Sequence, residues 1–348
     1  MSDSDDQAMI AEATARILTD LADPQTVNAA GAYDSVPLWQ ALEEAGLTRA
    51  WVPEASGGAG VPLATGFEIL RIAGQYACPA PLAETLIAGW VLAQTGIAIP
   101  DGPVAVVPVR AAKGLSLDVD QISGTAKSVP FAAEAVLLVV VLNDQVMTVA
   151  PDQYQATPRA TDMGDQRCDV RFDRAHVGAA AVHEGMSQRL EQIGAVARAC
   201  QMTGALETAL AITTDYTGER EAFGRKIGKF QAVQQNLAQL AGEVAAALTA
   251  SGSAAETLSL EPHESDAAFF EVASAKIRCG EAVATGAAIA HQAHGAIGWT
   301  QDYTLQMFTR RMFAWRDDFG SEADWAVRLG NHVARQGADR LWPMLTTR

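Results

Sequence analysis

The sequence predicts an α+β chain in which two helical regions flank a middle β region. Its length of 348 residues corresponds to two or three domains. Residues 1–100 and 184–348 carry apolar side chains at intervals of three and four, whereas residues 101–183 carry short valine-rich runs separated by Gly, Asp and Asn. We therefore expect an N-terminal helical domain (1–100), a middle β domain (101–183) and a C-terminal helical bundle domain (184–348).

In the N-terminal region, residues 5–21 and 38–47 have helical periodicity, and Pro24 follows the end of the first helix. Residues 51–60 contain three glycines and a proline, which predict a turn. Two further helices fit residues 63–75 and 82–94.

In the middle region, the valine runs and the strict alternation of residues 115–120 predict short strands joined by turns. Such strands are typical of a small antiparallel sandwich or barrel.

In the C-terminal region, one apolar stripe runs through residues 230–248, and a second occupies residues 190–204. These long helices suggest a four-helix bundle, with the small, polar segment 251–264 as a connecting loop.

The charge balance restricts the partners of the chain. It has 25 Lys and Arg against 41 Asp and Glu, a net charge of −16, which disfavours nucleic acid and anionic membranes as partners. A local basic pocket could still bind a phosphorylated small molecule. The acidic N-terminal segment has no signal-peptide pattern, and no apolar run is long enough to cross a bilayer. The four cysteines lie far apart in no metal-ligand spacing, so we expect reduced thiols, no metal and a cytoplasmic location.

Two segments stand out, in a chain without a Rossmann, P-loop, zincin or nucleophile-elbow motif. Residues 216–231 concentrate four cations, and an arginine can bind a pyrophosphate with two parallel hydrogen bonds. The alternative is a solvated surface loop. Residues 292–303 contain Gly295 and Gly298, which allow close backbone approach, or else form a helix C-cap and turn. The four cations of the first segment are Arg220, Arg225, Lys226 and Lys229.

Together these segments resemble the acyl-CoA dehydrogenase family. Its pattern is an Arg-x-x-Phe-Gly loop, a Phe-Gln helix start, then a Gln-x-x-Gly-x-x-Gly turn, followed by a conserved arginine that Arg310 matches here. The N-terminal turn 53–60 and the middle region also fit this family. The matching residues are Arg220, Phe223-Gly224, Phe230-Gln231, Gln292, Gly295 and Gly298.

The resemblance implies an N-terminal helical domain, a middle β-barrel and a C-terminal four-helix bundle. It also implies FAD shared across a subunit interface, an acyl-CoA substrate, and electron-transfer flavoprotein as the acceptor. By the same resemblance, Arg220 would neutralise the pyrophosphate and Phe223 would pack on the cofactor. Further candidate cofactor contacts are Gln231, Gln292, the Gly295 backbone and Ser321.

The chain departs from the family at the catalytic base. The family's base is a glutamate in a Glu-Gly-Thr stretch, where this chain has Phe319 followed by Gly320 and Ser321. Some members use a glutamate on the first bundle helix instead, where this chain has Gly194. Neither residue can accept a proton. Asp317 and Asp318 are the candidates that remain, with a solvated acidic pair beside Arg316 as the alternative, and Glu191 is a further candidate.

The chain also lacks the family's flavin-ring stretch, Thr-Glu-Pro…Gly-Ser-Asp, where residues 108–114 read Pro-Val-Arg-Ala-Ala-Lys-Gly. The chain would thus keep the residues that bind the FAD of a neighbouring subunit, and it would lack the residues that bind the flavin ring of its own FAD. Residues 310–316 resemble a stretch of the α2β2 enzymes of bacterial steroid breakdown.

Three hypotheses follow. The first is a FAD-dependent acyl-CoA dehydrogenase subunit of a homo- or hetero-oligomer, dimer or tetramer, for a linear, branched or steroid thioester. The second is a non-catalytic partner that completes a sister chain's FAD site. The third is a flavin-free scaffold.

Overall fold

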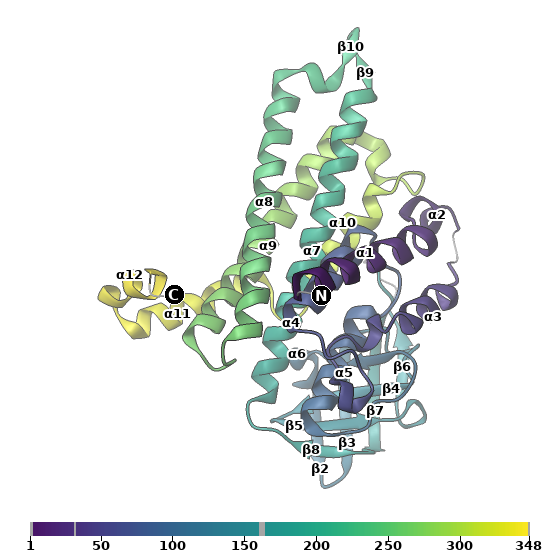
Figure 1. Ribbon diagram of the computed structural model, residues 1–348, viewed down its shortest axis with the longest axis vertical. Coiled ribbons are helices and arrows are strands. Elements are labelled where there is room, and N and C mark those ends of the chain that lie inside the picture. The colour runs from purple at the N-terminus through teal and green to yellow at the C-terminus, as the bar shows by residue number, and fades with distance from the viewer. Residues whose placement is uncertain (1–2, 31–32, 160–163, 347–348) are drawn as a thin grey trace.

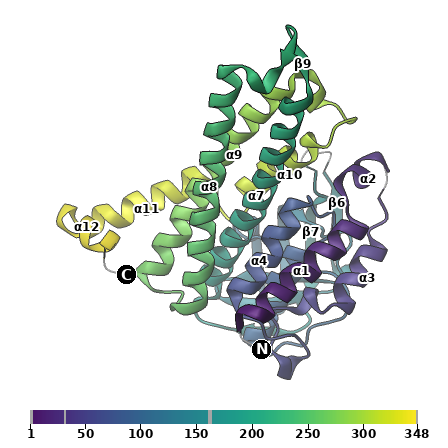
Figure 2. The ribbon, with the colours of Figure 1, turned by 45° about the horizontal axis from the view of Figure 1, so that its top comes forward.

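A computed structural model of the chain describes residues 3–30, 33–159 and 164–346. Helices, strands and helices follow one another along the chain (Figure 1). In Figures 1 and 2 the strands lie at one end of the long bundle helices and a small hairpin lies at the other.

Helix α5 lies against strand β1 and the first bundle helix, α7, while α4 packs on α7 and α1 packs on α4. Every α5 side chain from Leu82 to Leu92 is therefore buried, and the helix has no polar face. Gly58 lies so close to Val52 that an added Cβ would overlap its carbonyl group, which fixes the predicted turn. The elements are α1 (Asp3–Leu21), α2 (Pro24–Ala29), α3 (Val36–Glu44), α4 (Leu63–Gln75) and α5 (Leu82–Thr95), with 3-10 turns η1 (Leu47–Arg49) and η2 (Glu54–Ser56).

The middle region contains two four-stranded sheets, ordered β1-β4-β5-β8 and β2-β3-β7-β6. Among the strand pairs of the described residues, β1 and β4 alone run parallel. Side chains from both sheets, among them Val140 and Phe172, share one core. The strands are β1 (Val104–Val106), β2 (Leu115–Asp118), β3 (Gln121–Pro130), β4 (Leu137–Leu142), β5 (Gln145–Val149), β6 (Gln155–Pro158), β7 (Arg167–His176) and β8 (Ala180–Val182), with α6 (Val109–Ala112) and η3 (Pro151–Gln153) between strands.

Within the described residues the two sheets share no hydrogen-bonded strand pair, so they form a sandwich rather than the closed barrel implied by the resemblance. The first sheet is buried on both faces, because Val139 and Val141 pack into the helical core while Leu138 and Val140 face the second sheet. This double burial explains why the chain has a continuous valine run there instead of alternation.

The bundle consists of α7 (Met186–Glu219), α8 (Gln231–Leu260), α9 (Asp266–His294) and α10 (Leu305–Asp317). Helix α4 crosses α7 at Gly204, where a Cβ would overlap the Arg71 carbonyl group. The expected loop over 251–264 is mostly helix, because buried Ala254 and Leu258 continue the apolar stripe of α8 down to Leu260.

The C-terminal helices α11 (Glu322–Gln336) and α12 (Ala338–Thr346) extend to one side of the bundle in both views (Figures 1 and 2). Ser321 caps α11, since its hydroxyl accepts a hydrogen bond from the Asp324 amide and the Asp324 carboxylate accepts one from the Ser321 amide. All four cysteines are free and buried. None of the helices in the described ranges combines the length and the apolar character needed to cross a membrane.

Candidate functional site

Residues 220–230 form a cationic hairpin between α7 and α8. Strands β9 (Glu221–Ala222) and β10 (Arg225–Lys226) pair antiparallel, and the 3-10 turn η4 (Ile227–Lys229) leads into α8. The two loop residues, Phe223 and Gly224, have φ values of 51° and 78°, as a type I′ hairpin loop requires. A phenylalanine is costly in this left-handed conformation, and its side chain is 96% exposed. Such an exposed, strained aromatic residue indicates a contact surface.

The cationic hairpin carries unneutralised positive charge. None of its four cationic side chains forms an ion pair with another part of the described chain, and all four residues are exposed. Arg225 lies over the ring of Phe230, with its guanidinium carbon 4.0 Å from the ring centre. Although the net charge of the protein is −16, the hairpin is locally positive and would attract an anion.

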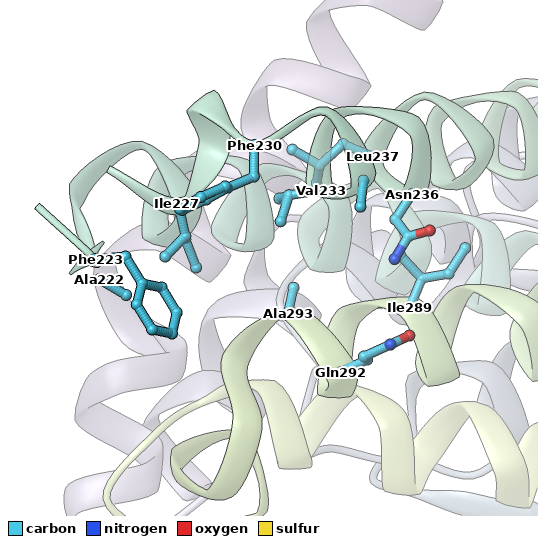
Figure 3. Close-up of a pocket in the computed structure, with 11 residues that line it drawn as sticks. Ala222, Phe223, Ile227, Phe230, Val233, Asn236, Leu237, Ile289, Gln292 and Ala293 are labelled. Atoms are coloured by element: carbon cyan, nitrogen blue, oxygen red, sulfur yellow. The ribbon is translucent and has the colours of Figure 1, made fainter. Parts of the chain in front are cut away.

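A groove of about 350 Å³ lies between the hairpin, α8 and α9, and we call it the hairpin groove (Figure 3). Its walls are apolar, and two carboxamides, Asn236 and Gln292, are its polar groups. Figure 3 shows Phe223 at one end of the groove and both carboxamides towards the other. The apolar lining includes Ile227, Val233, Leu237, Ile289 and Ala293.

The groove brings together the two segments that stand out in the sequence. Phe223 comes from the hairpin, and Gln292 comes from the last turn of α9, just before Gly295 (φ 67°) ends that helix. Arg220 is the C-cap of α7 and Gln231 begins α8; both are exposed and lie beside the groove lining rather than in it. The assignment of cofactor contacts to these five residues stays a prediction.

The predicted base positions lie at the other end of α7. Gly194 and Arg220 are 26 positions apart, or about 39 Å along a helix. The ring of Phe319 lies on Gly194, so an added Cβ there would overlap the ring. Phe319 is 4% exposed, and its carbonyl accepts a hydrogen bond of 2.9 Å from Trp325 Nε1. The two positions that the resemblance assigns to the family's base thus contact each other through the Phe319 ring.

Beside this contact lies a buried group of charges that we call the junction cluster. Asp318 accepts two 2.8 Å hydrogen bonds from the Arg167 guanidinium and a 3.0 Å bond from Arg198 Nε. Arg198 also donates to Glu84 at 2.5 Å. Arg311 donates to Asp165 at 2.9 Å. The cluster therefore joins all three regions of the chain. Its members are Glu84 on α5, Asp165 just before β7, Arg167 on β7, Arg198 on α7, Arg311 on α10 and Asp318 just after α10.

The junction cluster argues against the predicted role of Asp318 as a base. Burial alone would raise the pKa of Asp318, but the charges of Arg167 and Arg198 outweigh burial and hold the pKa below its ordinary value. A carboxylate that binds two guanidinium groups so strongly is a poor proton acceptor. The alternative hypothesis of a solvated acidic pair is also wrong for Asp318, which is only 8% exposed.

The other candidates have different surroundings. Asp317 is exposed at the end of α10, and partial burial of its carboxyl raises its pKa. Arg316 pairs with Glu322 rather than with the aspartates. Glu191 pairs with Arg328 at 3.0 Å. Ser321 hydrogen-bonds Asp324 within the α11 cap, so its hydroxyl is occupied by the protein itself.

Sequence reasoning missed the junction cluster and Asn236. Arg198 lies within the apolar stripe of α7, and a charge at a core-facing helical position signals a buried partner. Asn236 lies next to Leu237 and three residues after Val233, on the face that lines the groove.

Comparison with known proteins agrees with this architecture. Residues 185–317 match the family described as "Acyl-CoA dehydrogenase, C-terminal domain". The acyl-CoA dehydrogenase IpdE2 of Mycobacterium tuberculosis is 28% identical over 318 residues, which cover 89% of this chain and 92% of that protein. The bundle region thus matches the acyl-CoA dehydrogenase family, and the chain is similar to acyl-CoA dehydrogenases over most of its length.

Two solved structures share the fold across nearly the full length. The "Tcur3481-Tcur3483 steroid ACAD G363A variant" is 26% identical, with a TM-score of 0.85 over 97% of this chain and 100% of that chain. The ChsE4-ChsE5 complex from Mycobacterium tuberculosis has a TM-score of 0.84 at 20% identity, over 94% of this chain and 97% of that chain. The predicted acyl-CoA dehydrogenase-like fold is therefore confirmed, and the predicted resemblance to this family is borne out. Members of this family are FAD-dependent oxidoreductases that act on the CH–CH bond of an acyl-CoA thioester.

Proposed function

We propose that this chain is the non-catalytic subunit of a heteromeric acyl-CoA dehydrogenase, and that its cationic hairpin completes the FAD site of a sister chain. When bound, FAD accepts the hydride that leaves the β-carbon of the acyl thioester. The sister chain would supply the base and the flavin-ring site. This chain would bind the adenosine and pyrophosphate part of the cofactor.

The contact between Phe319 and Gly194 carries the proposal. A phenyl ring offers no proton acceptor, and here it is buried and occupies the space directly beside the Gly194 Cα. The junction cluster next to it is buried and paired, so a flavin ring would have to break ion pairs to enter between α7 and β7. We therefore infer that this chain does not hold a flavin ring of its own.

The hairpin end of the bundle, by contrast, fits the dinucleotide part of FAD. It combines unpaired cations for a pyrophosphate, apolar walls for a flat base and carboxamides for its polar edge. In the lone chain this surface is open, because Phe223 is almost fully exposed. A half-site of this kind needs a second subunit.

The names of the relatives point the same way. Tcur3481-Tcur3483 and ChsE4-ChsE5 are each named as pairs of chains, and the first is named a steroid acyl-CoA dehydrogenase. By analogy we propose a hetero-oligomer with a steroid-type thioester as substrate, a cytoplasmic location, and electron-transfer flavoprotein as the acceptor.

Flavin content tests the proposal. The chain is expressed alone and together with a family member that carries the glutamate base, and flavin absorbance is measured per complex. We expect a colourless lone chain and one flavin per pair of unlike chains. One flavin per subunit in the lone chain would overturn the proposal in favour of a homomeric enzyme. No flavin with any partner would overturn it in favour of a scaffold.

The matched variants are Arg220→Ala and Arg335→Ala, both at exposed arginines without an ion pair among the described residues. Loss of a charged hydrogen bond to the pyrophosphate should weaken FAD binding to the complex about 10- to 100-fold in the first variant. Arg335 lies on α11, so its loss should leave FAD binding unchanged. Equal FAD affinity in both variants would contradict the pyrophosphate role.

A further inference from the structure

The hairpin groove contains one polar feature that pyrophosphate binding leaves unexplained. Asn236 is half-buried on an otherwise apolar face of α8 and has no hydrogen-bond partner among the described residues. Gln292, on the facing helix α9, likewise has none. Figure 3 shows the two carboxamides close to Ile289, towards the end of the groove away from Phe223. Two open carboxamides beside apolar walls are the mark of a binding site for a flat group with a polar edge.

We propose that Asn236 is the specificity-determining residue of the hairpin groove, and that its carboxamide reads the amino edge of an adenine base. This inference rests on the proposed function and deepens it. A carboxamide presents one acceptor and one donor side by side. Adenine presents the complementary pair, its N6 amino group and an adjacent ring nitrogen, and Asn and Gln are the usual partners of that edge.

The order of groups along the groove agrees with this assignment. The cations lie on the hairpin beside Phe223, and the carboxamides lie towards the opposite end. A nucleotide would therefore place its phosphates at the hairpin and its base at Asn236. The apolar walls formed by Val233, Leu237 and Ile289 would contact the faces of the base.

The test compares FAD with a flavin dinucleotide whose base is purine without the 6-amino group. The protein is the flavin-free heteromeric complex, and the readout is the dissociation constant of each cofactor. The wild-type complex should bind FAD about 5- to 150-fold more tightly than the analogue, since the analogue leaves the Asn236 oxygen unpaired. In Asn236→Leu the two affinities should lie within about 2-fold of each other.

Gln239→Leu is the control, because Gln239 is an exposed carboxamide on the same helix outside the groove lining. It should keep the wild-type preference for FAD. Equal binding of both cofactors by the wild-type complex, or an unchanged preference in Asn236→Leu, would overturn the inference.

Arg220→Ala separates this inference from the proposed function. If Arg220→Ala weakens FAD binding while Asn236→Leu keeps the preference, the inference about Asn236 fails and the half-site stands. If neither variant changes FAD binding, the hairpin does not hold the cofactor and the proposed function fails with it. Thermal melting of both variants checks that the fold is intact.

Discussion

The phenyl ring of Phe319 lies directly on the Cα of Gly194, so the two positions predicted to correspond to the family's base contact each other. The geometry depends on both partners, because only a residue without a Cβ leaves room for the ring. Phe319 itself has a left-handed backbone (φ 53°), which is costly for a bulky residue. The contact is thus a packed structural feature, and mutation can test it from either side.

We expect Gly194→Ala to destabilise the chain by about 1–3 kcal/mol, because the added methyl group overlaps the Phe319 ring. Phe319→Leu should recover part of this loss, and urea unfolding of both single variants and the double variant measures the coupling. Gly218→Ala is the matched control on the same helix, since nothing lies within 4 Å of its added Cβ. This control should gain about 0.5–1 kcal/mol from helix propensity. Additive effects of the two mutations would contradict the packing.

Asp318→Asn should cost about 3–5 kcal/mol of folding stability, because it leaves Arg167 and Arg198 without their shared carboxylate. Asp101→Asn is the control, since Asp101 pairs with Arg49 at a fully exposed surface position. Its cost should be at most about 1 kcal/mol. Similar chemical unfolding midpoints for the two variants would mean that the junction cluster contributes little.

The pH dependence of stability should also show the effect of Asp318. Its folded-state pKa lies below the ordinary 3.8, so the unfolded chain binds more protons as the pH falls through that region. The stabilisation is therefore fully present above about pH 5 and decreases below about pH 4. Acid unfolding of the wild type should be steeper in this window than that of Asp318→Asn. Parallel acid-unfolding curves for both proteins would be the contrary result.

Lys276 should make the folding stability depend on pH in the alkaline range. Its ammonium group is buried and donates to the carbonyls of Trp315 (3.1 Å) and Arg316 (2.6 Å). Burial lowers its pKa from 10.5 to about 8. Between pH 8 and pH 10.5 the unfolded chain therefore keeps this proton while the folded chain loses it, so folding becomes more favourable as the pH rises. The free energy of unfolding of the wild type, compared with that of Lys276→Met, should increase by about 3 kcal/mol over this range. Buried thiols titrate in both proteins, so the difference between them is the readout, and a constant difference across this range would disprove the shift.

Flavin retention by the heteromeric complex should depend on salt. The cations of the hairpin have no acidic partners among the described residues, and 1 M salt shortens the screening length from about 10 Å to about 3 Å. We expect flavin to dissociate more readily at 1 M than at 0.1 M NaCl, and this salt effect to shrink in Lys226→Ala combined with Lys229→Ala. Gel filtration with absorbance detection measures the retained flavin. A salt effect of the same size in both complexes would assign it to other contacts.

The local sequence pattern predicted the order of helices and strands and the hairpin segment, because helical spacing of apolar residues and the glycines of loops can be recognised within a few residues. It could not predict that Gly194 meets Phe319, since the two lie 125 positions apart and the contact depends on how α7 packs against the end of α10. The same is true of Asp318, which looks like part of an exposed acidic pair until Arg167 and Arg198 approach from other elements. Strand β4 likewise shows no alternation of apolar and polar residues, because both of its faces are buried against other elements.

The junction cluster has a practical consequence for dividing the chain into fragments. An excised bundle would retain Arg198 and Asp318 without Glu84 and Arg167, and an isolated sandwich would expose Arg167 without Asp318. In each fragment, charged side chains that are buried and paired in the intact chain would lose their partners and become exposed to water. Expression trials, proteolytic trimming and domain-swap chimaeras are best designed around the whole polypeptide.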